Sequence, residues 1–271
     1  MISRGLFRAD RLIELSAGAK PVLALDTGTP VASLALFAGG RIVAHRTRPT
    51  TSHGAALPNT VAELLREAHL GLRDLGAVAV GIGPGSFTGL RVGLSYAKGV
   101  ALATGCALAG IPSLDATALE TLETHVNQAP IGAEICAIID ARKGEVYRAL
   151  YRVVSNGLEK RLADAVIPVG RLGSELGESP ILVGDATAND AATVMANRGQ
   201  RVVVVDRQAL DRRARTGALL GAARLALGDT DRIHSLEPLY VRPPDAVRPA
   251  SAPAAQEGVW SAERKNSSGS M

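Results

Sequence analysis

The sequence predicts an α/β protein of two lobes, in which mixed sheets are flanked by helices. Apolar runs of strand type alternate with longer segments whose apolar positions follow a helical period. A pattern of tight hairpins followed by a helix occurs near residue 21, and hairpins recur near residue 133. The chain has 271 residues, enough for one two-lobed domain, and 46% of them are hydrophobic. Two similar halves are therefore expected to face each other across a cleft.

The two ends of the chain differ in composition from its centre. Residues 1–20 are expected to be a mobile extension. The tail 247–271, rich in Ala, Ser, Pro and charge, is expected to be disordered. Between the ends, residues 21–118 are predicted to form the N-terminal lobe and residues 119–212 the C-terminal lobe. The segment 213–246 is expected to pack back on the N-terminal lobe.

The N-terminal lobe is predicted to open with an antiparallel meander within residues 21–47, because glycine-containing turns separate three apolar runs. An amphipathic helix is predicted over 54–70, and a buried strand over 77–82. A second helix follows and ends at Ala103, where Gly105 is placed to cap it.

The C-terminal lobe is predicted to follow a helix over 114–126. A hairpin comes next, made of AEICAIID and EVYRALYRV and joined by the turn 141–144. Short strands are predicted at 181–183 and 202–205, alternating with helices. A helix over 212–227 closes the domain.

Composition limits the kinds of function. Aromatic residues make up 3% of the chain, which leaves few stacking platforms for unpaired bases and argues against a dedicated single-strand RNA binder. The net charge is +4, and the cluster of Arg212, Arg213 and Arg215 could contact phosphate, although a solvated helix face is the favoured interpretation. No apolar stretch approaches the length of a membrane span, and we expect a cytoplasmic protein.

The sequence shows no catalytic constellation and no metal site. Cys106 and Cys136 lie in apolar runs and are predicted to be core residues. Ser86 is not followed by a glycine two residues later, as a nucleophile elbow would require. The histidines lack the short spacing that places two metal ligands on one helix face. We therefore predict neither a catalytic residue nor a metal ligand.

The strongest local signal is the segment GIGPGSFTGLRVG at residues 81–93, between a predicted strand and a helix. Backbone N–H groups at a helix N-terminus can bind an anion, but a purely structural turn is the favoured interpretation. A second signal, Asp26–Thr29, lies where kinases and ATPases of the actin/Hsp70 type bind metal and phosphate. The candidate residues of this vestigial nucleotide or anion site are Asp26, Thr27, Gly28, Thr29, Gly83, Gly85, Ser86 and Thr88.

A working nucleotide site would need matching loops in the second half of the chain. The turn after Asp140 is Ala-Arg-Lys-Gly, whose bulky side chains would crowd a phosphate. The later candidate loop, 183–187, contains a single glycine. We predict that the nucleotide site is degenerate. The alternative, which the sequence leaves open, is a working kinase or ATPase in which Asp26 and Asp140 or Asp185 hold magnesium.

Small residues recur at intervals of four on the helix after the glycine-rich loop. Gly89, Gly93, Ala97 and Ala101 share one face, which lets another element approach closely. From spacing alone, packing within the chain and an external partner are about equally favoured. The helix over 54–70 is the expected neighbour within the chain.

Several motifs together resemble one family. They are LALDTGT at 23–29, the helix start at 53–58, GIGPGSFTGLRVGLSYAKGVALATG at 81–105, IDARKGEVY at 139–147 and LEPLYVRPPDA at 236–246. With these motifs the chain resembles the TsaB (YeaZ) family over roughly residues 21–246. The segment 81–105 is long and specific enough to carry the resemblance alone.

The resemblance implies an actin/Hsp70/sugar-kinase-like (ASKHA, ribonuclease-H-like) fold, homologous to the catalytic subunit TsaD but without its metal-binding histidine pair. It implies a non-catalytic partner that supports TsaD in placing threonylcarbamoyl on the adenosine next to the anticodon of tRNA (t6A37). TsaE is implied as a further ATPase partner, and a homodimer is implied for the free protein. Contact with tRNA is expected only within the complex. No cofactor is expected to be required, and weak ATP or ADP binding is left open.

The resemblance also assigns the first two helices of the N-terminal lobe to the interface with TsaD or with a second copy. On this assignment Gly93→Leu would abolish assembly and leave the monomer mostly folded. Two further alternatives are a protease, suggested by descent, and a plain RNA-binding module. The expected interface residues are Leu57, Val61, Leu64, Gly89, Gly93, Ala97 and Ala101.

Overall fold

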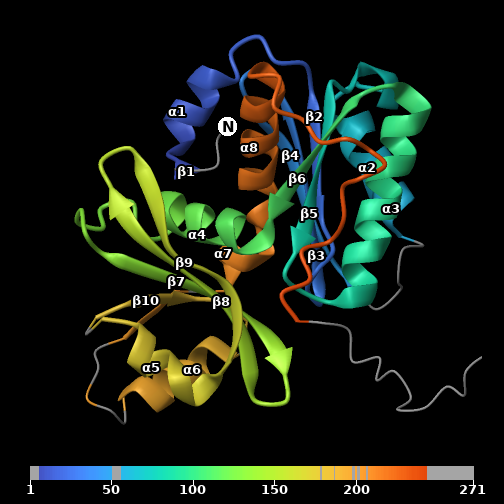
Figure 1. The fold of residues 1–271 in the computed structure, drawn as a ribbon. Helices are drawn as coiled ribbons and strands as arrows, with labels where there is room; N and C mark the ends of the chain where they lie inside the picture. Colours follow the sequence, from blue (N-terminus) through green and yellow to red (C-terminus); the bar gives the residue numbers. More distant parts are fainter. Residues whose placement is uncertain are drawn as a thin grey trace, which may run out of the picture.

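The computed structural model describes residues 6–50, 56–177, 179–185, 187–196, 199, 202–205 and 207–242. Within this part of the chain, two mixed sheets flanked by helices form two lobes (Figure 1). The predicted tail 247–271 lies outside the described residues, as does the start of the helix predicted over 54–70.

The N-terminal lobe contains a five-stranded sheet of order β4-β3-β2-β5-β6. β2 pairs antiparallel with β3 and parallel with β5, so the meander turns into a parallel half. The strands are β2 (Val22–Asp26), β3 (Val31–Ala38), β4 (Arg41–Pro49), β5 (Ala77–Gly83) and β6 (Ala107–Pro112). The first meander is confirmed, and β6 is a strand that the sequence did not predict.

The C-terminal lobe repeats this order as β9-β8-β7-β10-β11, with β1 added beside β9. In both lobes the third, second, first, fourth and fifth strands of the unit lie side by side, so the same five-stranded unit occurs twice. The strands are β1 (Leu6–Phe7), β7 (Glu134–Arg142), β8 (Glu145–Val154), β9 (Gly157–Pro168), β10 (Ile181–Val183) and β11 (Val203–Val205). The predicted two-lobed α/β class is confirmed.

Helices cover the two sheets in layers (Figure 1). One apolar cluster fills the space between the sheets around α4 and α8, a second lies beneath α2 and α3, and a third lies beneath α5 and α6. The helices are α1 (Ala9–Leu15), α2 (Leu57–Glu67), η2 (Leu72–Asp74), α3 (Phe87–Thr104), α4 (Ser113–Thr124), η3 (Val169–Arg171), α5 (Leu172–Glu175), α6 (Thr187–Ala196), α7 (Gln208–Asp211) and α8 (Arg213–Ala226). As predicted, Gly105 ends α3 in a left-handed conformation, and its N–H donates to Ala101 O.

The segment before β2 is part of the fold. β1 pairs antiparallel with β9 of the C-terminal lobe. α1 packs on α8, and Leu12 on α1 is completely buried in the central core. The expectation of a mobile extension is therefore wrong for residues 6–20. Two paired residues fix the start of this segment, and Leu12, with Ala9, Leu15 and Ala19 beside it, packs on the core although the segment also carries many charged residues.

α4 and the end of the chain connect the two lobes. α4 packs against α8 and against β7, so the expected lobe boundary at residue 118 falls inside a helix shared by both lobes. After α8, the chain runs back along β6 toward the C-terminal lobe (Figure 1). We call its last described part, residues 231–242, the C-terminal strap. No helix in the described ranges is long and apolar enough to cross a membrane.

Candidate functional site

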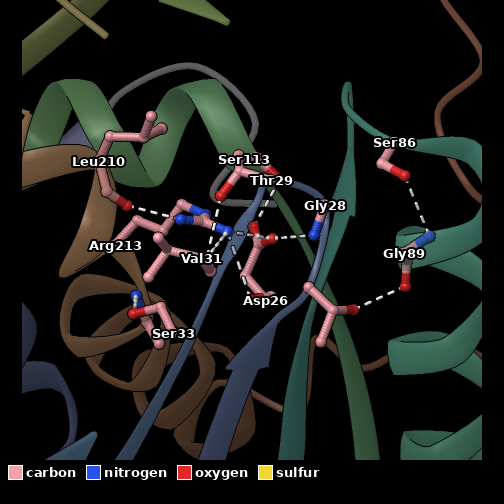
Figure 2. A network of polar contacts seen from close by, with 12 residues as sticks. Asp26, Gly28, Thr29, Val31, Ser33, Ser86, Gly89, Ser113, Leu210 and Arg213 are labelled. Carbon is pink, nitrogen blue, oxygen red and sulfur yellow. Dashed lines mark hydrogen bonds and ion pairs between the residues drawn. The ribbon is translucent and has the colours of Figure 1, made fainter. Parts of the chain in front are cut away.

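Asp26 ends β2 where the N-termini of α4 and α8 meet (Figure 2). Its Oδ1 accepts hydrogen bonds from Gly28 N at 2.8 Å and from Arg213 Nη2 at 2.8 Å. Its Oδ2 accepts a hydrogen bond from Ser113 Oγ at 2.5 Å. Asp26 is 4% exposed, and both of its carboxylate oxygens accept hydrogen bonds from the protein.

Arg213 is the buried cation of this site, with 0% exposure. Its guanidinium also donates to Leu210 O at 2.6 Å and to Val31 O at 3.3 Å. Burial by itself raises the pKa of the Asp26 carboxyl. The charge and hydrogen bond of Arg213 and the Ser113 hydrogen bond outweigh burial and hold that pKa below its ordinary value of 3.8. The site is therefore an ionised, internally neutralised pair.

The glycine-rich loop packs directly on the turn after Asp26. Ser86 N donates to Gly28 O at 2.7 Å, and a Cβ on Gly85 would lie within 3.0 Å of that oxygen. Thr27 Oγ1 donates to Gly89 O at 2.7 Å, where a Cβ would also clash with Thr27 O. The glycines let two backbones touch, which leaves no room for a phosphate between them.

The remaining candidate residues of the anion site also serve the local structure. Ser86 Oγ accepts from Gly89 N at 3.3 Å and caps α3. Thr29 Oγ1 donates to Val31 O, Gly83 has a φ of 103°, and Thr88 is exposed on α3. The structure brings the predicted residues of both loops together, and hydrogen bonds within the chain connect the loops. The favoured structural-turn interpretation of the glycine-rich loop agrees with this packing.

The equivalent turn of the C-terminal lobe follows β7. Asp140 is exposed, its N donates to Asp185 Oδ2 at 2.8 Å, and its Oδ1 accepts from Arg142 N at 2.6 Å. Arg142 and Lys143 have φ values of 63° and 57°, in the left-handed region that favours glycine. Two bulky residues occupy the turn that a phosphate would need to approach, as the sequence predicted.

These residues do not fit a magnesium–nucleotide complex. Magnesium needs free oxygen ligands in octahedral geometry, and the Asp26 oxygens are used by three protein donors. A metal ion there would have to displace the guanidinium of Arg213 and leave a buried cation without its partner. In the described ranges, no three His, Cys, Asp or Glu residues lie close enough to hold a metal ion.

The small-residue face of α3 points into the protein. A Cβ on Gly93 would lie within 3.0 Å of Thr27 Oγ1 and 3.2 Å from Leu25 Cδ1, so this face packs on β2 and not on α2. Ala97 and Ala101 are buried as well. The expected interface assignment is therefore wrong for these residues, because spacing reveals a close-packed face without showing what packs on it.

The expected interface residues of α2 are also core residues. Leu57, Val61 and Leu64 are 7%, 1% and 0% exposed and belong to the cluster beneath α2 and α3. The outward face of α3 is different. Leu102 is 63% exposed, and a Cβ on Gly99 would meet nothing within 4 Å. The exposed surface of α2 and α3 is therefore on the side opposite to the expected interface residues.

Sequence reasoning missed Arg213 and Ser113 as site residues. Of the arginine cluster, Arg213 is buried, Arg212 is exposed and Arg215 Nε lies 3.5 Å from Glu120 Oε1. A charged residue in a basic run carries no sequence signal of burial. Only the placement of α8 against β2 shows which of the three arginines faces inward.

Cys136 is expected to be unreactive in the native protein. It is completely buried, and burial raises the pKa of its thiol to about 12, so the thiolate is scarce at pH 8. Iodoacetamide at pH 8 should modify Cys136 only after denaturation, as measured by peptide mass. Rapid modification of the folded protein would contradict this burial.

Comparison with known proteins places the chain in a family. The family model described as "TsaD: tRNA N6-adenosine threonylcarbamoyltransferase" matches residues 47–203. The "tRNA threonylcarbamoyladenosine biosynthesis protein TsaB" of Escherichia coli is 36% identical over 137 residues, which are 51% of this chain and 57% of that protein. The protein of the same name from Bacillus subtilis is 32% identical over 144 residues, 53% of this chain and 60% of that protein. The chain thus matches little more than half the length of these relatives.

Solved structures extend the similarity over most of the fold. YeaZ from Pseudomonas aeruginosa superposes with a TM-score of 0.66 and 28% identity, covering 82% of this chain and 99% of that chain. A second solved structure, described as an uncharacterized protein with similarity to peptidase YeaZ from Pseudomonas aeruginosa, gives a TM-score of 0.68 and 27% identity over 82% of this chain and all of that one. The family model, which is described as TsaD, covers more than half of the chain, and the relatives and the solved structure named above are called TsaB or YeaZ. The chain therefore belongs to the TsaB (YeaZ) family.

Proposed function

We propose that the chain is a non-catalytic scaffold and activating subunit for synthesis of N6-threonylcarbamoyladenosine in tRNA, and that it binds and supports TsaD. Family membership supports the pathway. The observation that carries the non-catalytic role is the Asp26 carboxylate, whose oxygens are bonded to Arg213, Ser113 and Gly28. On this proposal the chain needs no cofactor of its own.

The rival function is a kinase or ATPase of the same fold. It would need Asp26 with Asp140 or Asp185 to hold magnesium. Asp26 is neutralised by Arg213, and the Asp140 turn is filled by Arg142 and Lys143. Magnesium-dependent ATP hydrolysis by the isolated chain would favour the rival. If the isolated chain hydrolyses no ATP and yet supports an active TsaD, the scaffold role is supported.

The proposed binding surface for TsaD is the outward face of α2 and α3. Gly99 lies in the middle of an 18-residue helix, where glycine costs about 1 kcal/mol relative to alanine, and no contact among the described residues explains it. A partner helix can approach closely at Gly99 and bury the exposed Leu102. The same face would pair two copies of the free chain. TsaE and tRNA would join through the assembled complex.

Leu102→Glu is expected to weaken binding to the TsaD of the same organism at least about tenfold. Burying a leucine contributes about 1.5–3 kcal/mol, and a buried unpaired carboxylate adds a desolvation cost. At a concentration where the free chain does not pair, the free energy of unfolding should stay unchanged, because Leu102 is 63% exposed. Isothermal titration calorimetry measures the affinity.

Ile131→Glu is the matched control, since Ile131 is 73% exposed in the turn before β7 of the other lobe. It should bind TsaD as tightly as the unmodified chain. If Leu102→Glu and Ile131→Glu bind TsaD with equal affinity, α3 is not part of the interface. The scaffold role would then depend on whether the unmodified chain binds TsaD. Failure of the unmodified chain to bind TsaD at all would remove the scaffold role.

A further inference from the structure

The C-terminal strap, residues 231–242, starts on the N-terminal lobe and ends on the C-terminal lobe (Figure 1). We propose that this strap is a latch: the contact of Arg242 with the β7–β8 turn holds the two lobes at a fixed angle. This inference rests on contacts within the chain and does not depend on the proposed function.

The first anchor fixes the start of the strap to the edge of the N-terminal sheet. Asp231 N donates to Leu108 O at 2.8 Å, which extends the sheet past β6. The Asp231 carboxylate accepts from Gly110 N at 2.7 Å and from Arg224 Nη1 at 3.0 Å. Three polar contacts at one residue make this end a stable base for the rest of the strap.

The second anchor fixes the middle of the strap to β6 and β5. Leu236 packs on the bare backbone of Gly110, where a Cβ would lie 2.8 Å from Leu236 Cδ1. Leu239 N donates to Ile82 O at 2.7 Å. The strap thus remains against the sheet until it reaches the glycine-rich loop, where β5 ends.

The same anchor includes an aromatic and cationic contact at the start of α3. The rings of Tyr240 and Phe87 lie 5.6 Å apart between centroids. Arg91 Nε donates to the Tyr240 hydroxyl at 3.1 Å, and its guanidinium carbon lies 3.6 Å from the centre of the Phe87 ring. Tyr240 is therefore held by two side chains of the N-terminal lobe.

The third anchor crosses to the C-terminal lobe. Arg242 Nη1 donates to Ala141 O at 2.8 Å, and Arg242 Nη2 pairs with the Glu145 carboxylate. Residues 141 and 145 flank the β7–β8 turn, whose Arg142 and Lys143 adopt the left-handed conformation. One arginine therefore binds both sides of a tightly folded turn.

Chain geometry turns these anchors into a latch. Two residues span at most about 7 Å, so the backbone of Arg242 cannot move far while Tyr240 stays against Phe87. Separation of the lobes at this place must therefore break either the Tyr240 contacts or the Arg242 contacts. α4 is shared by the lobes, β1 pairs with β9 and α1 packs on α8, so the lobes are already connected at these places. The strap adds a further tie between the end of β5 and the β7–β8 turn.

Spin labels on both lobes test the latch in the full chain. Arg41→Cys on β4 and Glu159→Cys on β9 provide exposed sites away from the proposed binding surface, and the native Cys106 and Cys136 are buried. The unmodified strap should give one narrow distance distribution by pulsed electron–electron double resonance. Arg242→Ala should broaden it. The backbone amides of the β7–β8 turn should exchange with deuterium about tenfold faster.

Two further variants make the result specific to the latch. Glu145→Ala should reproduce the broadening, and adding it to Arg242→Ala should broaden the distribution no further, because both act on one contact. Arg232→Ala is the matched control, since Arg232 is an exposed arginine of the same strap. Its distances and exchange rates should equal those of the unmodified chain. Distributions and exchange rates of Arg242→Ala that match those of Arg232→Ala would overturn the proposal.

Discussion

Gly93→Leu is expected to destabilise the folded chain by at least about 3 kcal/mol, at the upper end of the cost of overpacking a core. Even a Cβ at this position would lie within 3.0 Å of Thr27 Oγ1, and a leucine would push α3 away from β2. Thr27 would also lose its hydrogen bond to Gly89 O. Urea denaturation of the isolated chain measures the loss, which should appear without any partner.

Gly99→Ala is the matched control on the same helix. A Cβ on Gly99 meets no atom within 4 Å, so the substitution should stabilise the isolated chain by up to about 1 kcal/mol through helix propensity. The two substitutions therefore distinguish the inner face of α3, which contains Gly93, from its outer face, which contains Gly99. If Gly93→Leu and Gly99→Ala had equal unfolding free energies, the inward orientation of Gly93 would be contradicted.

Arg213→Met is expected to cost about 3–5 kcal/mol at neutral pH, because it leaves the buried Asp26 carboxylate without its cation. Adding Asp26→Asn should recover part of this loss, since the second substitution removes the uncompensated charge. Urea denaturation of the two single variants and the double variant forms a complete cycle. A double variant less stable than Arg213→Met would contradict the role of the ion pair.

The same pair predicts how stability depends on pH. In the unmodified chain the pKa of Asp26 lies below its ordinary value of 3.8. The stabilisation of the folded chain by the ion pair is therefore complete above pH 3.8 and is lost as the pH falls through the folded-state pKa. In Arg213→Met, burial without the guanidinium raises the pKa of Asp26. The loss caused by Arg213→Met should therefore shrink as the pH is lowered and the carboxyl protonates. An equal loss at pH 7 and pH 4 would contradict this linkage.

The sequence predicted those elements whose structure depends on residues close together in the chain. Alternating apolar runs with glycine turns gave the meander of β2, β3 and β4, and Gly105 gave the end of α3. The second hairpin, which forms β7 and β8, predicted that the chain has two similar lobes. The degenerate character of the turn after Asp140 could also be predicted, because Arg142 and Lys143 stand where glycines would be needed.

Elements fixed by distant contacts escaped prediction. β6 is a short ALAGIP run between two helices, and β9 carries charged residues at 159–161 and 164 because it is half exposed. Helical spacing marked one face of α3 as close-packed, yet Thr27, far from Gly93 in the sequence, decides that this face is internal. Arg213 is buried because α8 returns to β2, a contact that no local pattern specifies.

Reconstituted synthesis of threonylcarbamoyladenosine on tRNA tests most directly whether the chain acts as a supporting subunit. The assay would compare the chain alone, TsaD of the same organism alone, and the two together, each with the threonylcarbamoyl donor and tRNA. We expect modified adenosine only when both proteins are present, with no magnesium-dependent ATP hydrolysis by the chain alone. Full activity of TsaD without the chain, or ATP turnover by the chain alone, would contradict the supporting role.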